Sequence, residues 1–351
     1  MEPLRAISHT ALTPLVCVLI IGAGLAVFKL DAAGLTLNSD YASYLETAEL
    51  FRGAPDAAAN PGRILKPLAP LSVAALETAL PPGTAFLVQV VVFYFLLIAA
   101  CYALGRAFGF AAKESALLAL LLGASYPVLR YGVDLYTETG ALFFCVLSFA
   151  LTLRYLRAPG WRVLLINSAV ITLGFLWKEY SAVAALAFGL AILAHPALSW
   201  RERFRDLFVY VGVFAVVNLA WEIFVYTRYH YTYLSWYHQA GEAGFKTEFT
   251  AFNIAKSLAA LLGLGWLLVP FGLARVRGLA VWQKRFLLIA IPASCMAFFW
   301  GYVSSRLFFI IAPAFALIAV LALSRVRHPA VRYGLVCAVL AGNVAWLLAS
   351  A

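Results

Sequence analysis

Long apolar stretches recur along the whole chain, and short polar connections separate them. A bilayer core needs roughly 20 apolar residues in a helix to cross it, and helices satisfy their own backbone hydrogen bonds in lipid. The pattern therefore predicts an all-α fold, a polytopic transmembrane helix bundle of about eleven spans. These spans are expected at residues 11–30, 85–107, 115–129, 139–156, 163–177, 180–194, 207–227, 257–274, 286–302, 307–324 and 333–350. The third, fifth and sixth are short for a full crossing.

Composition agrees with a membrane protein. Of the 351 residues, 64% are hydrophobic and only 12% are charged, which leaves too little polar surface to cover a soluble globule. The five cysteines have no paired spacing typical of a disulfide framework or a metal site, so we expect them to pack as small apolar side chains. We find no internal repeat and no low-complexity linker. The sequence predicts a single integral membrane domain over residues 1–351.

Charge distribution indicates the orientation of the spans. The formal net charge of +10 would suit a nucleic-acid partner, but the basic residues occur in short clusters between spans. That arrangement orients membrane proteins with the clusters inside, so no nucleic acid is expected. A break near Lys178-Glu179 is favoured, because one continuous helix there would move three later basic clusters outside. We expect a cytoplasmic N-terminus and, from the short loops, a bacterial inner membrane.

Two loops predicted on the non-cytoplasmic side are long, at residues 31–84 and 229–256, and we expect them to form the active-site face. Three short connections on the same side carry charges at apparent membrane depth, at residues 130–138, 178–179 and 304–306. A charge near the bilayer centre costs roughly 2.5 to 3.5 kcal/mol on insertion scales, so such residues usually line a cavity or pair with one another.

The first of these loops combines a carboxylate with cations. Asp40 opens a helical segment whose apolar face includes Tyr41 and Tyr44, and it could act as a helix cap or as a catalytic base. Arg63 and Lys66 follow on the same loop, before a proline-rich stretch that is not expected to continue as regular helix. Glycosyl transfer from a lipid phosphate needs a base for the acceptor hydroxyl and positive charge for the leaving phosphate.

The order of these residues resembles a known family. Asp40-Tyr41-x-x-Tyr44-x-x-x-Ala48, followed by Arg63-Ile64-Leu65-Lys66, is similar to the opening of GT-C fold glycosyltransferases, multi-span enzymes that use polyprenyl-phosphate sugars. Later similarities are Tyr136-Thr137-Glu138, Lys178-Glu179 and Ser305-Arg306-Leu307-Phe308. The resemblance implies that Asp40 is the catalytic general base. The loop has no Asp-x-Asp motif, so no cofactor is expected and a bound divalent metal is doubtful.

The other charged candidates each have a structural alternative. Glu138, one helical turn after Asp134, could face a cavity or solvate a helix start. Lys178 and Glu179 could form a local ion pair, or the lysine could hold a phosphate. The guanidinium of Arg306 suits a phosphate, but it could also anchor the chain at the headgroups.

An aromatic segment at residues 228–238 opens the second long loop. Such density is typical of the membrane interface, and it could alternatively form a platform for a sugar or an isoprenoid. His230 and His238 have no carboxylate at ligand spacing, so we expect no zinc, although either could carry a proton. The predicted substrate-binding set is Tyr41, Tyr44, Arg63, Lys66, Glu138, Lys178, Glu179, His230, His238 and Arg306.

The sequence thus predicts an inverting glycosyltransferase that moves a sugar from a polyprenyl monophosphate donor to a lipid, glycan or protein hydroxyl on the non-cytoplasmic face. Its expected partners are the donor, the acceptor and membrane lipids. A transporter or flippase of lipid-linked sugars is the main alternative, although the inverted repeats common in transporters are not visible. A non-catalytic membrane scaffold is the third possibility.

Overall fold

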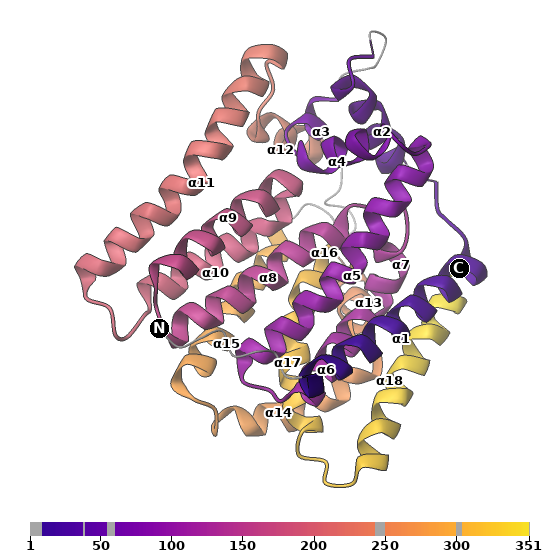
Figure 1. Ribbon diagram of the computed structural model, residues 1–351, viewed down its shortest axis with the longest axis vertical. Coiled ribbons are helices and arrows are strands. Elements are labelled where there is room, and N and C mark those ends of the chain that lie inside the picture. Colours follow the sequence, from indigo (N-terminus) through magenta and orange to yellow (C-terminus); the bar gives the residue numbers. More distant parts are fainter. Residues whose placement is uncertain (1–8, 38, 55–59, 243–249, 300–303, 351) are drawn as a thin grey trace.

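The protein is a bundle of helices (Figure 1). A computed structural model describes residues 9–37, 39–54, 60–242, 250–299 and 304–350, and every regular element within these ranges is helical. The long helices are α1 (His9–Ala33), α5 (Pro82–Phe108), α8 (Glu138–Arg157), α11 (Trp200–Tyr229) and α18 (Pro329–Ala349). This confirms the predicted all-α membrane fold.

Shorter apolar helices fill the space between the long ones. They are α6 (Ala112–Gly123), α7 (Tyr126–Gly132), α9 (Trp161–Trp177), α10 (Ala182–Leu193), α13 (Ala251–Leu262), α14 (Val269–Val276), α15 (Val281–Ser294) and α17 (Ala312–Leu323). Short 3₁₀ segments join several of them: η1 (Glu179–Ser181), η3 (Gly263–Leu268), η4 (Cys295–Phe299) and η5 (Phe309–Ile311). The predicted break at Lys178-Glu179 is present, because α9 ends at Trp177 and Lys178 is extended.

The predicted number of eleven spans is not confirmed. Among the described residues, seven segments are long and apolar enough to cross a membrane, and α6 with α7 makes an eighth if this pair, bent by 61°, is one span. Pro127 lies in the first turn of α7, and its ring would clash with the carbonyl of Gly123 if α6 continued straight into α7, which explains the bend. The predicted spans at 163–177 and 180–194 correspond to α9 and α10, which are too short to qualify by length.

Burial separates central helices from peripheral ones. In the most apolar windows of α8 and of the span Ser305–Leu323, 78% and 89% of the residues are buried within the protein, against 17% in α11. The exposed side chains of α11 are mostly large and apolar, including Phe208, Val216 and Ile223. Because lipid is the solvent for such a surface, α11 has the composition of a helix that faces the bilayer.

Basic connections gather at one end of the bundle. The guanidinium of Arg285 donates to the carbonyl of Ala194 at 2.6 Å, and Arg157 lies over the ring of Trp282 at 5.9 Å. These contacts join the ends of α8, α10 and the start of α15. The alternating direction of the helices places the turns after α5, α8, α10, α14 and α17 at this same end (lower part of Figure 1).

The first loop and the aromatic segment meet at the opposite end. Here lie α2 (Ser39–Phe51), α3 (Pro61–Ile64), α4 (Leu68–Leu76) and α12 (Tyr233–Glu242) (upper part of Figure 1). The indole of Trp221 donates to the carbonyl of Ile64 at 2.8 Å, and the hydroxyl of Tyr233 donates to that of Leu65 at 3.0 Å. Aromatic residues of α11 and of the second loop therefore hold the first loop, a use that neither sequence interpretation included.

One expectation about the first loop is wrong. The proline-rich stretch is helical from Leu68 onward, because a new helix, α4, begins there with Pro67 as its N-cap residue and Pro70 in its first turn. The first backbone N–H groups of a helix have no intrahelical partner, so proline costs little there.

Candidate active site

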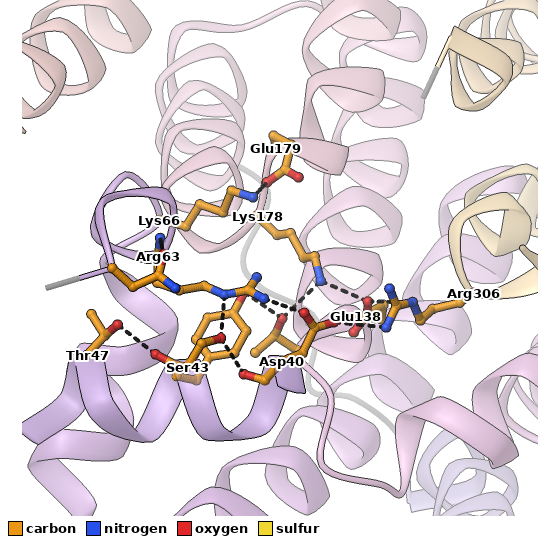
Figure 2. Close-up of polar contacts among 12 residues, drawn as sticks. Asp40, Ser43, Thr47, Arg63, Lys66, Glu138, Lys178, Glu179 and Arg306 are labelled. Carbon is orange, nitrogen blue, oxygen red and sulfur yellow. Dashed lines mark hydrogen bonds and ion pairs between the residues drawn. The ribbon is translucent and has the colours of Figure 1, made fainter. Parts of the chain in front are cut away.

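Asp40 lies between two guanidinium groups. It occupies the first turn of α2, where Oδ1 accepts a hydrogen bond from Nη2 of Arg63 and Oδ2 accepts one from Nη1 of Arg306 at 2.9 Å (Figure 2). Arg306 belongs to α16 (Ser305–Phe308), so Asp40 and Arg306 are 266 residues apart in the sequence. The Asp40 side chain remains 24% exposed, which leaves it accessible to a ligand.

Arg63 is fixed by the face of α2 that follows Asp40. Its Nε donates to Oγ of Ser43 at 2.9 Å, and its guanidinium lies 4.5 Å from the centre of the Tyr44 ring. Ser43 is not among the predicted site residues, although its position three residues after Asp40 places it on the same helix face. The other predicted tyrosine, Tyr41, packs edge-on against Phe86 at 5.4 Å.

Glu138 joins two further cations. Its Oε1 is 2.8 Å from Nζ of Lys178 and 3.3 Å from Nε of Arg306. Glu138 is the first residue of α8 but is only 1% exposed, so it is not a solvent-exposed charge at a helix start. Its other oxygen, Oε2, is buried without a hydrogen-bond partner among the described residues. Arg306 pairs with Asp40 and Glu138, so it is not a free interfacial anchor.

Lys66 and Glu179 form a separate buried pair. Nζ of Lys66 is 2.6 Å from Oε2 of Glu179 and 4.3 Å from the centre of the Trp236 ring. The alternative of a local pair between Lys178 and Glu179 is therefore wrong, because each is paired with a residue from another segment. Trp236 is an additional site residue that the sequence did not single out.

Thr137 connects α2 of the first loop with the end of α9 and with Lys178. Its carbonyl accepts from the indole N–H of Trp177 at 2.8 Å, and its hydroxyl lies 3.2 Å from Nζ of Lys178 and 3.1 Å from the hydroxyl of Tyr44. Trp177 comes so close to α8 that a Cβ at Gly140 would be 2.3 Å from the indole ring. Glycine is therefore required at this contact.

Seven residues make up what we call the charge cluster: Asp40, Arg63, Lys66, Glu138, Lys178, Glu179 and Arg306. Each of its four cations contacts a carboxylate, but there are only three carboxylates, so the cluster has a net formal charge of +1. Burial alone would raise the pKa of Asp40, but the positive charges of Arg63, Lys178 and Arg306 outweigh it and hold this pKa well below its ordinary value. Asp40 is thus an anion in the ligand-free protein.

The predicted histidines lie on the surface. His230 ends α11 in a left-handed conformation with φ of 51° and is exposed, and His238 is exposed on α12. None of the contacts that define the charge cluster includes either residue. A role for them in proton transfer stays a prediction.

The pair between Lys66 and Glu179 leads to a prediction about stability. We expect Lys66→Met to lower the free energy of unfolding by roughly 3 to 5 kcal/mol, because it leaves Glu179 buried without its counter-ion. The double variant Lys66→Met/Glu179→Leu should recover most of this loss, since an apolar pair of similar volume restores packing. Thermal unfolding of the purified variants in detergent measures both effects.

Arg205→Met is the matched control, because Arg205 pairs with Asp206 while 61% of its side chain is exposed. Asp206 itself is buried, but it keeps the hydrogen bond from the Tyr155 hydroxyl at 2.7 Å when Arg205 is removed. A much smaller change is expected there, since solvent also screens the exposed guanidinium. If Lys66→Met unfolded at the same temperature as the double variant or higher, Glu179 would not need Lys66 as a counter-ion, and the prediction would be wrong.

Comparisons with known proteins agree with the fold. No family model matches the sequence, and no curated protein matches it either. Among solved structures, ArnT from Cupriavidus metallidurans bound to undecaprenyl phosphate is similar, with a TM-score of 0.69 and 16% identity over 92% of this chain and 62% of that one. The oligosaccharyltransferase AglB from Archaeoglobus fulgidus, in complex with an inhibitory peptide and a dolichol-phosphate, has a TM-score of 0.59 and 12% identity.

These similarities confirm that the chain has the GT-C fold of integral membrane glycosyltransferases. The match to AglB covers 97% of this chain and 55% of the AglB chain. The chain thus spans 62% of the length of the ArnT structure and 55% of the length of the AglB structure.

Proposed function

We propose that the protein is an inverting glycosyltransferase that moves a sugar from a polyprenyl monophosphate donor to a hydroxyl group of a lipid, glycan or protein. The observation that carries this proposal is the position of Asp40, a partly exposed carboxylate between the guanidinium groups of Arg63 and Arg306. A base beside phosphate-binding cations is the equipment that this reaction needs. The similar structures that hold undecaprenyl phosphate and dolichol-phosphate support the same donor class.

In the proposed reaction, the acceptor oxygen attacks the anomeric carbon of the sugar while its proton passes to Asp40. The bond between that carbon and the phosphate oxygen breaks, and its electron pair leaves with the lipid phosphate. Attack and departure on opposite faces invert the anomeric configuration. Arg63 and Arg306 stabilise the negative charge that develops on the phosphate.

The charge balance of the cluster supports a monophosphate-linked donor. A sugar linked to a lipid through one phosphate is a phosphodiester with a single negative charge. That charge would be matched by the net formal charge of +1 on the cluster. A diphosphate-linked donor would bring at least two negative charges and leave a surplus of negative charge in a partly buried site, which is unfavourable.

Donor binding would also activate the base. In the ligand-free protein both oxygens of Asp40 are engaged by arginines, and their charges lower its pKa, which makes it a weak base. A phosphate that shares Arg63 and Arg306 would bring its negative charge close to Asp40 and raise its pKa. Asp40 would then accept a proton most readily when the donor is in place.

The other two cations have less direct roles in this proposal. Lys66 and Lys178 are almost fully buried, and each already lies within 3 Å of a carboxylate. Arg63 and Arg306 are 17% and 23% exposed, so they can reach a ligand. We therefore place Arg306 ahead of both lysines as a phosphate ligand. Glu138 is proposed to hold Lys178 and Arg306 in position.

The proposed reaction needs no metal or cofactor, because the guanidinium groups supply the positive charge at the leaving phosphate. Among the described residues, no group of three or more His, Cys, Asp and Glu side chains is arranged to hold a metal ion. We further propose that the basic end of the bundle is cytoplasmic, so that the charge cluster opens on the periplasmic side of a bacterial inner membrane.

Reconstituted protein provides the test. Nanodiscs that contain the protein are incubated with a polyprenyl phosphate whose sugar is radiolabelled, together with a crude lipid and glycan extract as acceptor. We expect the label to move to an acceptor, and the rate to remain the same when a chelator is present. A rate that falls to background with the chelator would contradict the metal-free proposal.

A parallel experiment in sealed vesicles distinguishes transfer from transport. If labelled donor crossed the bilayer without transfer to any acceptor, the protein would be a flippase and the proposed function would be wrong. Label that stays on the donor lipid in both experiments would also overturn it.

A further inference from the structure

A further buried carboxylate, Asp134, lies outside the charge cluster in the connection between α7 and α8. Its side chain has no exposed surface. Oδ1 accepts from the backbone N–H of Thr36 at 2.7 Å and from that of Leu135 at 2.8 Å. Oδ2 accepts from the Thr36 hydroxyl at 2.7 Å and lies 3.0 Å from Nζ of Lys29. Both oxygens are thus used by contacts that cross between α1, the first loop and the start of α8.

Lys29 is part of the same arrangement. It lies in α1, is completely buried, and its ammonium donates to the carbonyl of Gly34 at 2.7 Å as well as pairing with Asp134. A buried lysine in an apolar helix requires such a counter-ion. Lys29 and Asp134 therefore fix the end of α1 and the turn that leads into the first loop.

The two residues joined at this point are each four positions before a carboxylate of the charge cluster. Thr36 precedes Asp40, and Asp134 precedes Glu138. Those two carboxylates meet again at Arg306, whose Nη1 contacts Asp40 at 2.9 Å and whose Nε contacts Glu138 at 3.3 Å. The contacts form a closed ring: Asp134 to Thr36, along the chain to Asp40, across Arg306 to Glu138, and back along the chain to Asp134.

We propose that Asp134 is a positioning residue for the transfer reaction, because it sets the distance between the Asp40 and Glu138 carboxylates by holding Thr36. This inference rests on the proposed function. The mechanism is geometric: four residues cannot span more than about 14 Å, so the hold at Thr36 restricts where Asp40 can lie. Reacting groups displaced by about 1 Å can lose roughly 100-fold in rate.

Thr36→Val tests the proposal without removing a charge. Valine keeps the branched shape of threonine, but its side chain cannot donate to Oδ2 of Asp134, so only the backbone N–H contact with Oδ1 remains, whereas Thr36→Ser keeps the hydroxyl. We expect Thr36→Val to lower kcat roughly 10- to 100-fold, to leave donor Kd within about twofold and to leave the unfolding temperature near that of the wild type. Thr36→Ser should restore most of kcat.

Thr172→Val is the matched control, because the Thr172 hydroxyl donates only to the carbonyl of Ser168 in its own helix at 2.8 Å among the contacts described. It should leave kcat unchanged. Folded Asp134→Asn protein is expected to show the same loss of kcat as Thr36→Val. A loss of kcat, donor affinity and unfolding temperature together, without rescue by Thr36→Ser, would show a general structural role and overturn the proposal.

Hydrogen exchange measures the positioning without catalysis. In Thr36→Val, the amides of α2 should exchange faster than in the wild type, Thr36→Ser and Thr172→Val, and those of α17 should not change. If the wild-type protein transfers no sugar, the proposed function fails, but faster exchange confined to α2 still supports the hold on Asp40. Unchanged exchange in α2 overturns it, whether or not the protein is a transferase.

Discussion

Replacing Asp40 with asparagine is expected to lower kcat for sugar transfer by roughly 100- to 10,000-fold, the usual contribution of a general base. Donor affinity should not fall, and should rise modestly. Asparagine has nearly the same shape, but it removes the negative charge that Arg63 and Arg306 share in the ligand-free protein. Both arginines are then available to the donor phosphate. Single-turnover kinetics and equilibrium binding of a labelled donor measure the two effects separately.

Glu46→Gln is the control for this experiment, because Glu46 is an exposed carboxylate on the same helix, α2. Its removal should change neither kcat nor donor affinity. Near-normal turnover by Asp40→Asn would remove Asp40 from the reaction. A large loss of donor affinity in this variant would instead show that Asp40 binds the donor directly.

The second large effect is expected at Arg306. Arg306→Ala should weaken donor binding roughly 10- to 100-fold, since hydrogen bonds to charged groups contribute about 1.5 to 3 kcal/mol and each 1.4 kcal/mol is tenfold in affinity. The effect on kcat at saturating donor should be smaller. Loss of Arg306 removes one of the charges that lower the pKa of Asp40, so the carboxylate becomes a stronger base.

Two further variants make the Arg306 result specific. Arg306→Lys keeps the charge but not the planar fork, so it should restore only part of the donor affinity. Arg228→Ala removes an exposed arginine from the end of α11 that lies near the first loop, and it should leave donor affinity unchanged. Equal donor affinity in wild type and Arg306→Ala would exclude Arg306 as a phosphate ligand.

The sequence predicts the fold well because membrane helices are encoded locally. Apolar runs identify the long helices, and the alternation of basic clusters identifies the break at Lys178, which the structure confirms. The number of spans was harder to predict, because a break inside an apolar run has little effect on hydropathy. The bend between α6 and α7, which decides between seven and eight spans among the described residues, is an example.

The pairing of charges could not be predicted from spacing. Sequence neighbours suggested Lys178 with Glu179, whereas the folded chain pairs Lys178 with Glu138 and Glu179 with Lys66. These partners are distant in sequence, so only the packing of helices decides which of them meet. Lys29 is the clearest missed signal. A lysine inside an apolar helix indicates a buried partner, and the structure identifies that partner as Asp134.

The large separation between Asp40 and Arg306 has a consequence for biosynthesis. Asp40 and Arg63 leave the ribosome early, and a nascent chain can form their pair long before residue 306 has been translated. The second guanidinium arrives only with the last part of the bundle. Chains whose translation stops before α16 therefore lack half of the proposed phosphate clamp, so they should not release sugars from the carrier pool during membrane insertion.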